Sequence, residues 1–74
     1  MRNVKMEMKS RARMVSGLVN LLKDDADQLS ADTGDFDLIC LEESIKDTKS
    51  TIQMLIDNVT ELEYLMYLSR KGES

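Results

Sequence analysis

Histidine, proline and tryptophan are absent from the sequence, and there is a single cysteine, Cys40. One cysteine cannot close an intrachain disulfide, and structural zinc sites are built from cysteine and histidine, so both kinds of cross-link are excluded. A nucleophilic serine or threonine needs an adjacent base, and the usual one, histidine, is missing. We therefore expect a protein that is not an enzyme and that uses no metal and no cofactor.

The chain is also short, with 74 residues, of which 42% are apolar and 32% are charged. A hydrophobic core in a chain of this length rarely supplies more than about 3 to 5 kcal/mol without a disulfide, a metal or a partner. Since the first two are excluded, we expect a second chain to complete the core.

Long apolar runs are missing as well, and no stretch approaches the roughly 18 apolar residues that cross a membrane. The basic start and the apolar residues 14–22 imitate a secretory signal. However, Ser16 and Asn20 interrupt the apolar part, and Lys23 and Asp24 stand where small residues precede a cleavage site. We expect a cytoplasmic protein with no membrane partner.

The strongest positive signal is a heptad pattern in the second half of the chain. Positions 38 to 69, taken in alternating steps of three and four, are apolar in eight of ten cases. The overall composition would give about four, so the pattern predicts a helix over about residues 36–70. The apolar positions are Leu38, Leu41, Ile45, Ile52, Leu55, Val59, Leu62 and Met66.

The first half repeats this spacing less strictly and predicts a helix over about residues 3–30. Its apolar positions are Val4, Met8, Val15, Leu18, Leu22 and Leu29, and they are interrupted by Arg11 and Asp25. Gly17, inside this helix, is either a kink, a close helix crossing, or a tolerated glycine.

Residues 31–35 are predicted to form the turn between the helices. Gly34 can adopt the left-handed conformation that ends a helix, and Thr33 or Asp35 can cap the next one. Such a short connection makes the helices antiparallel neighbours, so the fold is an all-α helical hairpin of one domain, residues 1–74. Pairing across this turn places Leu22 opposite Ile45.

Several apolar residues lie outside this pairing, among them Ile39, Ile56, Leu65 and Leu68, and residues 62–68 are apolar or aromatic in six of seven positions. A hairpin alone would expose them, so we expect two hairpins to form a homodimeric four-helix bundle or coiled coil. The predicted assembly core is Val15, Leu18, Leu22, Leu38, Leu41, Ile45, Ile52, Leu55, Val59, Leu62 and Met66.

Charge is divided sharply along the chain. Residues 1–23 carry six bases and one acid, whereas the remainder carries four bases and thirteen acids. The first helix therefore begins with bases and ends with acids, which opposes its dipole. Either an antiparallel arrangement of two hairpins compensates for this, or the basic end contacts another molecule.

The basic residues of the first helix follow a spacing of three and four residues and form one stripe, and the same end of the hairpin holds two tyrosines and several methionines, which suit adaptable binding surfaces. The predicted partner-binding residues are Arg2, Lys5, Lys9, Arg13, Tyr64 and Tyr67. We expect a small regulator or inhibitor, of the kind that phages and mobile elements encode, that docks on a target protein.

Two other functions fit the same pattern. The basic stripe could bind RNA or DNA as an accessory four-helix bundle, although the overall charge of -4 opposes this. Alternatively, the hairpin could be a structural or chaperone-like coiled-coil component. The sequence leaves both alternatives open.

Overall fold

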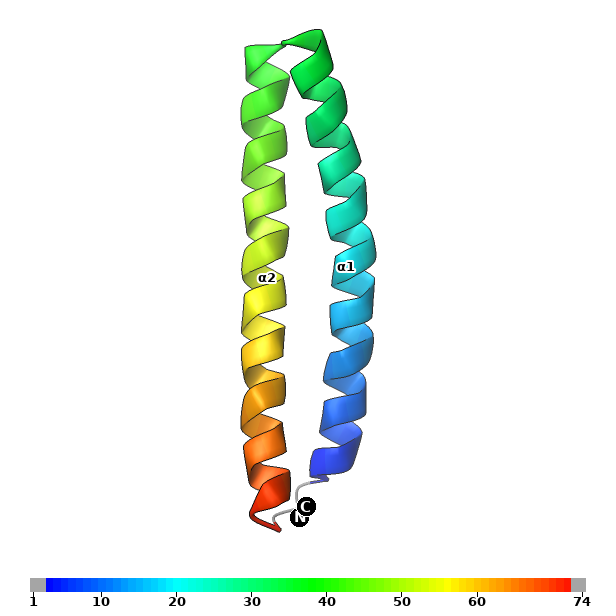
Figure 1. The fold of residues 1–74 in the computed structure, drawn as a ribbon, viewed down its shortest axis with the longest axis vertical. Coiled ribbons are helices and arrows are strands. Elements are labelled where there is room, and N and C mark those ends of the chain that lie inside the picture. The colour runs from blue at the N-terminus through cyan, green and yellow to red at the C-terminus, as the bar shows by residue number, and fades with distance from the viewer. Residues whose placement is uncertain (1–2, 73–74) are drawn as a thin grey trace.

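The computed structural model describes residues 3–72, which form two long helices, α1 (Val4–Asp35) and α2 (Leu38–Arg70). The helices lie side by side and antiparallel over their whole length (Figure 1). The rod measures 53 × 16 × 14 Å, as expected for about 33 residues at about 1.5 Å each. The predicted all-α hairpin is confirmed.

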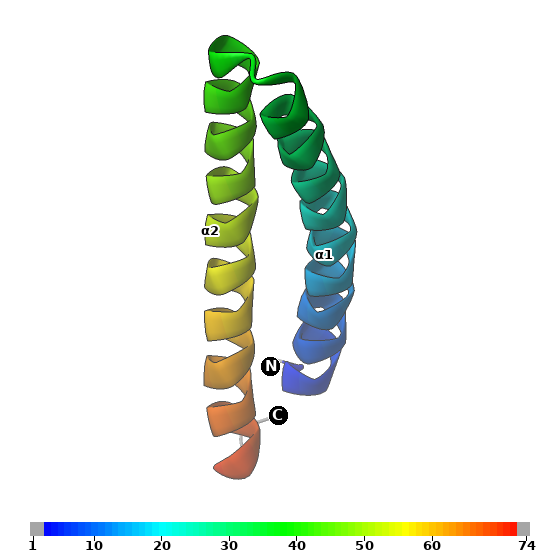
Figure 2. The same ribbon diagram turned by 45° about the horizontal axis from the view of Figure 1, so that its top comes forward.

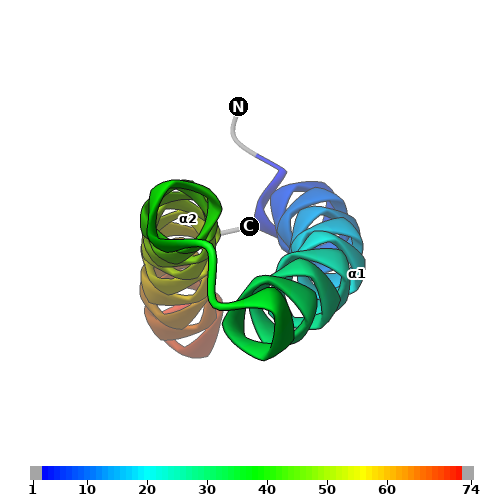
Figure 3. The ribbon, with the colours of Figure 1, turned by 90° about the horizontal axis from the view of Figure 1, so that it is seen from above.

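The two helices wind slightly around each other. α1 is gently curved, with its convex side facing away from α2 (Figure 2). Seen along the rod, the two helix axes are inclined in opposite senses (Figure 3). This is the geometry expected of helices that keep a heptad seam in contact along their length.

Each helix begins with a side-chain cap. The Asn3 carboxamide oxygen accepts from the backbone N–H of Met6 at 3.1 Å. Asp37 precedes α2, and its carboxylate accepts from the N–H groups of Ile39 at 3.1 Å and Cys40 at 3.3 Å. Asp37 therefore caps α2, in place of the predicted Thr33 or Asp35.

The turn differs from the predicted one. α1 does not end near residue 30 but continues through residues 31–35, and only Phe36 and Asp37 connect the helices. Phe36, not Gly34, adopts the left-handed conformation, with φ 54° and ψ 39°. Within the extended α1, the Thr33 hydroxyl donates to the Leu29 carbonyl at 2.8 Å, so Thr33 does not cap the next helix.

The turn predicts that two substitutions of opposite kind, one that introduces a glycine and one that removes a glycine, both stabilise the hairpin. Phe36→Gly should stabilise the hairpin by about 1 kcal/mol, because glycine adopts the left-handed conformation without a Cβ clash. Gly34→Ala should also stabilise it, by up to about 1 kcal/mol, since Gly34 is helical and an added Cβ meets no atom within 4 Å. Urea denaturation checks both. Destabilisation by Gly34→Ala would restore Gly34 as the residue that ends α1.

Gly17 lies inside α1, where the helix continues without interruption. A Cβ built at Gly17 meets no atom within 4 Å, so no other part of the described chain approaches it closely. The close-crossing hypothesis is therefore wrong within one hairpin, and Gly17 is a tolerated glycine on the outer surface.

The α1 side of the seam agrees with the sequence pattern. Apart from Glu7, which is also half-buried, the residues that are at least half-buried recur in steps of three and four and include both polar interruptions. They are Val4, Met8, Arg11, Val15, Leu18, Leu22, Asp25, Leu29 and Asp32. The heptad spacing of α1 therefore identified the face that packs on α2.

The α2 side of the seam differs from the prediction in every second position. Leu41, Thr48, Leu55 and Leu62 are partly buried, as predicted. The intervening seam positions, however, are occupied by Ser44, Thr51, Asn58 and Leu65, all buried. The predicted core residues Leu38, Ile45, Ile52, Val59 and Met66 are instead 41–64% exposed.

The physical reason is that the polar residues of the two seams pair with each other. The Arg11 guanidinium donates to Asn58 Oδ1 at 2.9 Å, and the Thr51 hydroxyl donates to Asp25 at 2.6 Å. The Ser44 hydroxyl donates to Asp32, which also accepts from Gln28 at 3.0 Å. A buried polar group without a partner costs free energy, so this rotation of α2 satisfies Arg11, Asp25 and Asp32 together.

The register differs accordingly. The predicted pairing of Leu22 with Ile45 would have placed Asp25 opposite position 42, but Asp25 contacts Thr51. The shift follows from the turn, because a connection at Phe36 and Asp37 moves every α2 partner further along the chain.

The only fully apolar cluster of buried residues in the described chain lies at the open end of the rod. Val4 is 1% exposed and Leu65 is 0% exposed; they pack together with Leu68, and Met8 lies against them. Leu65 and Leu68 were predicted to face a second hairpin, but they pack on α1 instead. Ile39 and Ile56 do remain exposed.

Neither helix of the described chain has a stretch apolar and long enough to cross a membrane.

Candidate functional site

The largest candidate surface is an apolar stripe along α2, composed of Leu38, Ile45, Ile52, Val59 and Met66, which we call the α2 stripe. Its members are seven residues apart, so they form one line that runs almost the length of α2. Four of the five, all except Leu38, directly follow a buried residue of the α2 seam. The stripe therefore borders the contact with α1 without being covered by it.

Small residues of α1 border the same side of the hairpin. In an antiparallel helix pair, the positions that directly follow equivalent seam residues on the two helices flank the same face. On α1 these positions are Lys5, Ala12, Val19, Ala26 and Thr33, all exposed, and the three in the middle are apolar. Ala12, Val19 and Ala26 and the α2 stripe lie on the same side of the hairpin, which we call the apolar face.

The opposite face is more polar. Gln28 and Asp32 of α1 and Cys40, Glu43, Ser44 and Asp47 of α2 line a shallow hollow there. These residues confirm which positions of the two helices share that side. Its exposed apolar residues are confined to Met14, Leu21 and Met54.

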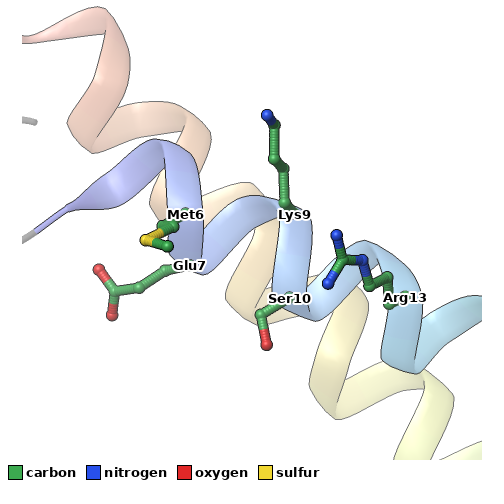
Figure 4. A pocket seen from close by; sticks show the side chains of 5 residues that line it. All are labelled: Met6, Glu7, Lys9, Ser10 and Arg13. Carbon is green, nitrogen blue, oxygen red and sulfur yellow. The ribbon is translucent and has the colours of Figure 1, made fainter.

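A second candidate surface is the basic row on α1. Lys5, Lys9 and Arg13 are exposed and lie four residues apart on the outside of the helix. Arg2, predicted to extend this row, lies outside the described residues. Figure 4 shows Lys9 and Arg13 at an open hollow that is also lined by Met6, Glu7 and Ser10. All five lining residues belong to α1, so the hollow is open and suits a macromolecular surface better than an enclosed small molecule.

The tyrosines lie at the same end of the rod but on the other helix. Tyr64 and Tyr67 are each about half exposed, and Lys71 places its ammonium 5.0 Å from the centre of the Tyr67 ring. Leu65 and Leu68, on either side of Tyr67, face α1, so Tyr67 points outward from α2. The structure therefore brings the basic row and the tyrosines to one end, but on the outer sides of two helices.

The turn end of the rod carries the opposite charge. Residues 24–43 contain eight acids and no base. Among the described residues no three histidine, cysteine, aspartate or glutamate side chains are grouped so that they could hold a metal ion. The long axis of the hairpin therefore joins a basic end to an acidic end.

Cys40, in the first turn of α2, is a free and exposed cysteine. Its hydrogen bond with Asp37 raises the pKa of the thiol, and the negative charges of Asp37, Asp32 and Glu43 add to the effect. The same cap interactions, above all the N–H of Cys40, lower the pKa of Asp37. The thiolate is therefore disfavoured, as acidic surroundings predict.

This pair predicts the reactivity of Cys40. Asp37→Asn keeps a good helix cap but removes the neighbouring charge, so the thiol pKa should fall and more thiolate should be present at pH 8. The rate of iodoacetamide alkylation should rise, and its pH profile should move to lower pH. Glu42→Gln is the matched control, since Glu42 does not contribute to the shift at Cys40. An unchanged profile for Asp37→Asn would contradict the assigned cause.

Comparison with known proteins found no match among protein-family models, curated proteins or solved structures.

Proposed function

We propose that this hairpin is a non-enzymatic protein–protein interaction module that works as a homodimeric four-helix bundle and docks on a target protein, as a small regulator or inhibitor does. The observation that carries the proposal is the α2 stripe, in which five large apolar side chains recur every heptad and stay 41–64% exposed. Soluble monomers rarely leave such a continuous apolar surface uncovered.

The two candidate surfaces support different roles. The apolar face suits association with another helical surface, because its residues have the spacing of a helix-packing seam. The basic row and the tyrosines suit a surface that binds the target protein. Charged and amphipathic side chains give specificity in the complex and remain hydrated when the target is absent. The charge of Lys5, Lys9 and Arg13 favours an acidic target surface.

Affinity capture from the native host tests the docking surface. Lys5→Glu/Lys9→Glu/Arg13→Glu and Tyr64→Ala/Tyr67→Ala are expected to lose a protein that the unchanged hairpin retains, with no loss of helical circular dichroism, since all five side chains are substantially exposed. Lys46→Glu/Lys49→Glu, with two reversed charges elsewhere on α2, is the matched control and should retain the protein. Equal capture by all variants would contradict the proposed docking surface.

Nucleic acid is the second candidate, and the basic row is the observation that favours it. A gel shift at low salt, lost in the Lys5→Glu/Lys9→Glu/Arg13→Glu variant and steeply reduced by added salt, would replace the target protein with RNA or DNA. The absence of a shift at high protein concentration would exclude this candidate.

A further inference from the structure

We propose that two copies of the hairpin pair through the apolar face and that they pair antiparallel, so that the turn of one copy lies beside the open end of the other. Ile52, at the middle of the α2 stripe, then lies at the twofold axis. This inference deepens the proposed function and rests on its homodimer, to which it adds the interface, the orientation and the register.

The elongated hairpin exposes more surface than a compact monomer of the same mass, and this area is enough for an interface of standard size. The chain exposes 5724 Å², whereas a compact monomer of 8.4 kDa is expected to expose about 4,600 Å². The excess of about 1,100 Å² is similar to the roughly 800 Å² that each partner buries in a stable interface of standard size.

The two long faces of the hairpin differ in what they offer a partner. On the apolar face, the α2 stripe presents a large apolar residue at each heptad, and Ala12, Val19 and Ala26 of α1 leave room beside it. On the opposite face, charged Glu7, Asp47 and Glu61 interrupt the apolar residues. Burying charged side chains costs more free energy than burying apolar ones, so the apolar face is the interface.

Twofold symmetry allows two ways to join this face to its own copy. If the copies point the same way, α2 of one copy lies against α1 of the other, and both turn ends meet. If they point in opposite ways, each α2 lies against the other α2, and each turn end meets an open end. Both arrangements bury the apolar face, so charge decides between them.

Charge favours opposite directions. The turn end carries eight acids in residues 24–43, so the same-direction dimer would bring two such sets together. The open end carries Lys5, Lys9 and Arg13 on α1, with Arg70 and Lys71 at the end of α2. In the antiparallel dimer the basic open end of each copy lies at the acidic turn end of the other, so like charges are kept apart. The arrangement also accounts for the charge of α1, which opposes its own dipole within one hairpin.

The register follows from the α2 stripe itself. An antiparallel stripe of five residues at equal spacing matches its copy best when its middle member meets itself. Ile52 then contacts Ile52, Ile45 contacts Val59, and Leu38 contacts Met66 of the other copy. Two Leu38 side chains lie about 42 Å apart, because 28 residues of helix separate them.

Disulfide cross-linking of single-cysteine variants in a Cys40→Ser background tests this arrangement. Ile52→Cys is expected to form a covalent dimer under mild oxidation. Leu38→Cys and Met66→Cys should each fail to cross-link alone but should form a mixed dimer when combined, with one of them carrying a mass tag. Gln53→Cys, beside Ile52 on the outer side of α2, is the matched control and should stay monomeric on a non-reducing gel.

The outcomes separate this inference from the proposed function. A dimer by sedimentation in which Val19→Cys cross-links to Ile52→Cys, while Ile52→Cys does not cross-link to itself, would show the same-direction arrangement and overturn the inference alone. A dimer in which Gln53→Cys cross-links but neither stripe variant does would overturn the assigned face. A monomeric chain would overturn both the inference and the homodimer on which it rests.

Discussion

Leu65→Ala is expected to lower the free energy of unfolding by about 3 kcal/mol, within the 2–5 kcal/mol usual for removing a buried leucine side chain. Leu65 is 0% exposed and belongs to the only fully apolar buried cluster of the described chain, with Val4 and Leu68. A small domain has little stability to lose, so the helical circular dichroism signal at 37 °C should fall markedly.

Met6→Ala is the matched control for this substitution. Met6 lies in the first turn of α1, near the same end of the rod, but its side chain is 68% exposed. Its truncation should change the free energy of unfolding by less than about 0.5 kcal/mol. Both variants must be compared at one protein concentration, because the stability of a dimer depends on it. Equal effects of the two substitutions would contradict the assigned core.

Ile52→Glu should have the second large effect, on association rather than on the fold of one hairpin. Ile52 is exposed in the hairpin, so a glutamate there is hydrated in the monomer. In the proposed dimer two such carboxylates would face each other at the twofold axis and lose water. We expect the dimer dissociation constant to rise at least 100-fold, which corresponds to about 2.7 kcal/mol.

Gln53→Glu is the control that separates the effect of the substituted position from the effect of the added negative charge. Gln53 is the next residue along α2 and points away from the apolar face, where its amide donates to Asp57 at 3.0 Å. The same added charge at this position should leave the dissociation constant within a few-fold of its original value. A similar loss of dimer in both variants would indicate a general effect of negative charge instead of an interface at Ile52.

The helices and the packed face of α1 could be predicted from heptad spacing, and the antiparallel pairing could be predicted from the short connection between the helices. The α2 seam could not be predicted from hydrophobicity, since Leu41, Leu55 and Leu62 belong to two possible seams. One seam adds the α2 stripe, and the other adds Ser44, Thr51 and Asn58. The seam that includes the α2 stripe has more apolar residues and was therefore predicted, but it is not the seam that contacts α1.

A signal for the correct seam was present in α1. Arg11 and Asp25 interrupt its apolar pattern, and a buried charged residue needs a partner on the facing helix. Asn58 and Thr51 supply these partners. Matching polar interruptions between the helices, as well as apolar positions, would have identified both the rotation of α2 and its register.

The turn was misplaced for a related reason. A glycine close to a predicted helix end usually takes the left-handed conformation, yet Phe36 takes it here. Asp37 is a strong cap and fixes the start of α2 through two backbone N–H groups. The chain must turn immediately before it, so α1 extends through Gly34 up to that point.

The structure divides the predicted assembly core into two groups of residues. Of the predicted assembly core, Val15, Leu18, Leu22, Leu41, Leu55 and Leu62 lie between the two helices of one hairpin. The remaining members form the α2 stripe. The sequence pattern had merged two seams, one that closes the hairpin and one that we assign to a second copy.

Sedimentation equilibrium of the unchanged chain at micromolar concentration tests the central claim most directly. We expect a mass of twice the 8.4 kDa of the chain, with loss of that species in Ile52→Glu and its retention in Gln53→Glu. A helical species that sediments at 8.4 kDa over the whole concentration range would contradict the claim that a second copy covers the apolar face.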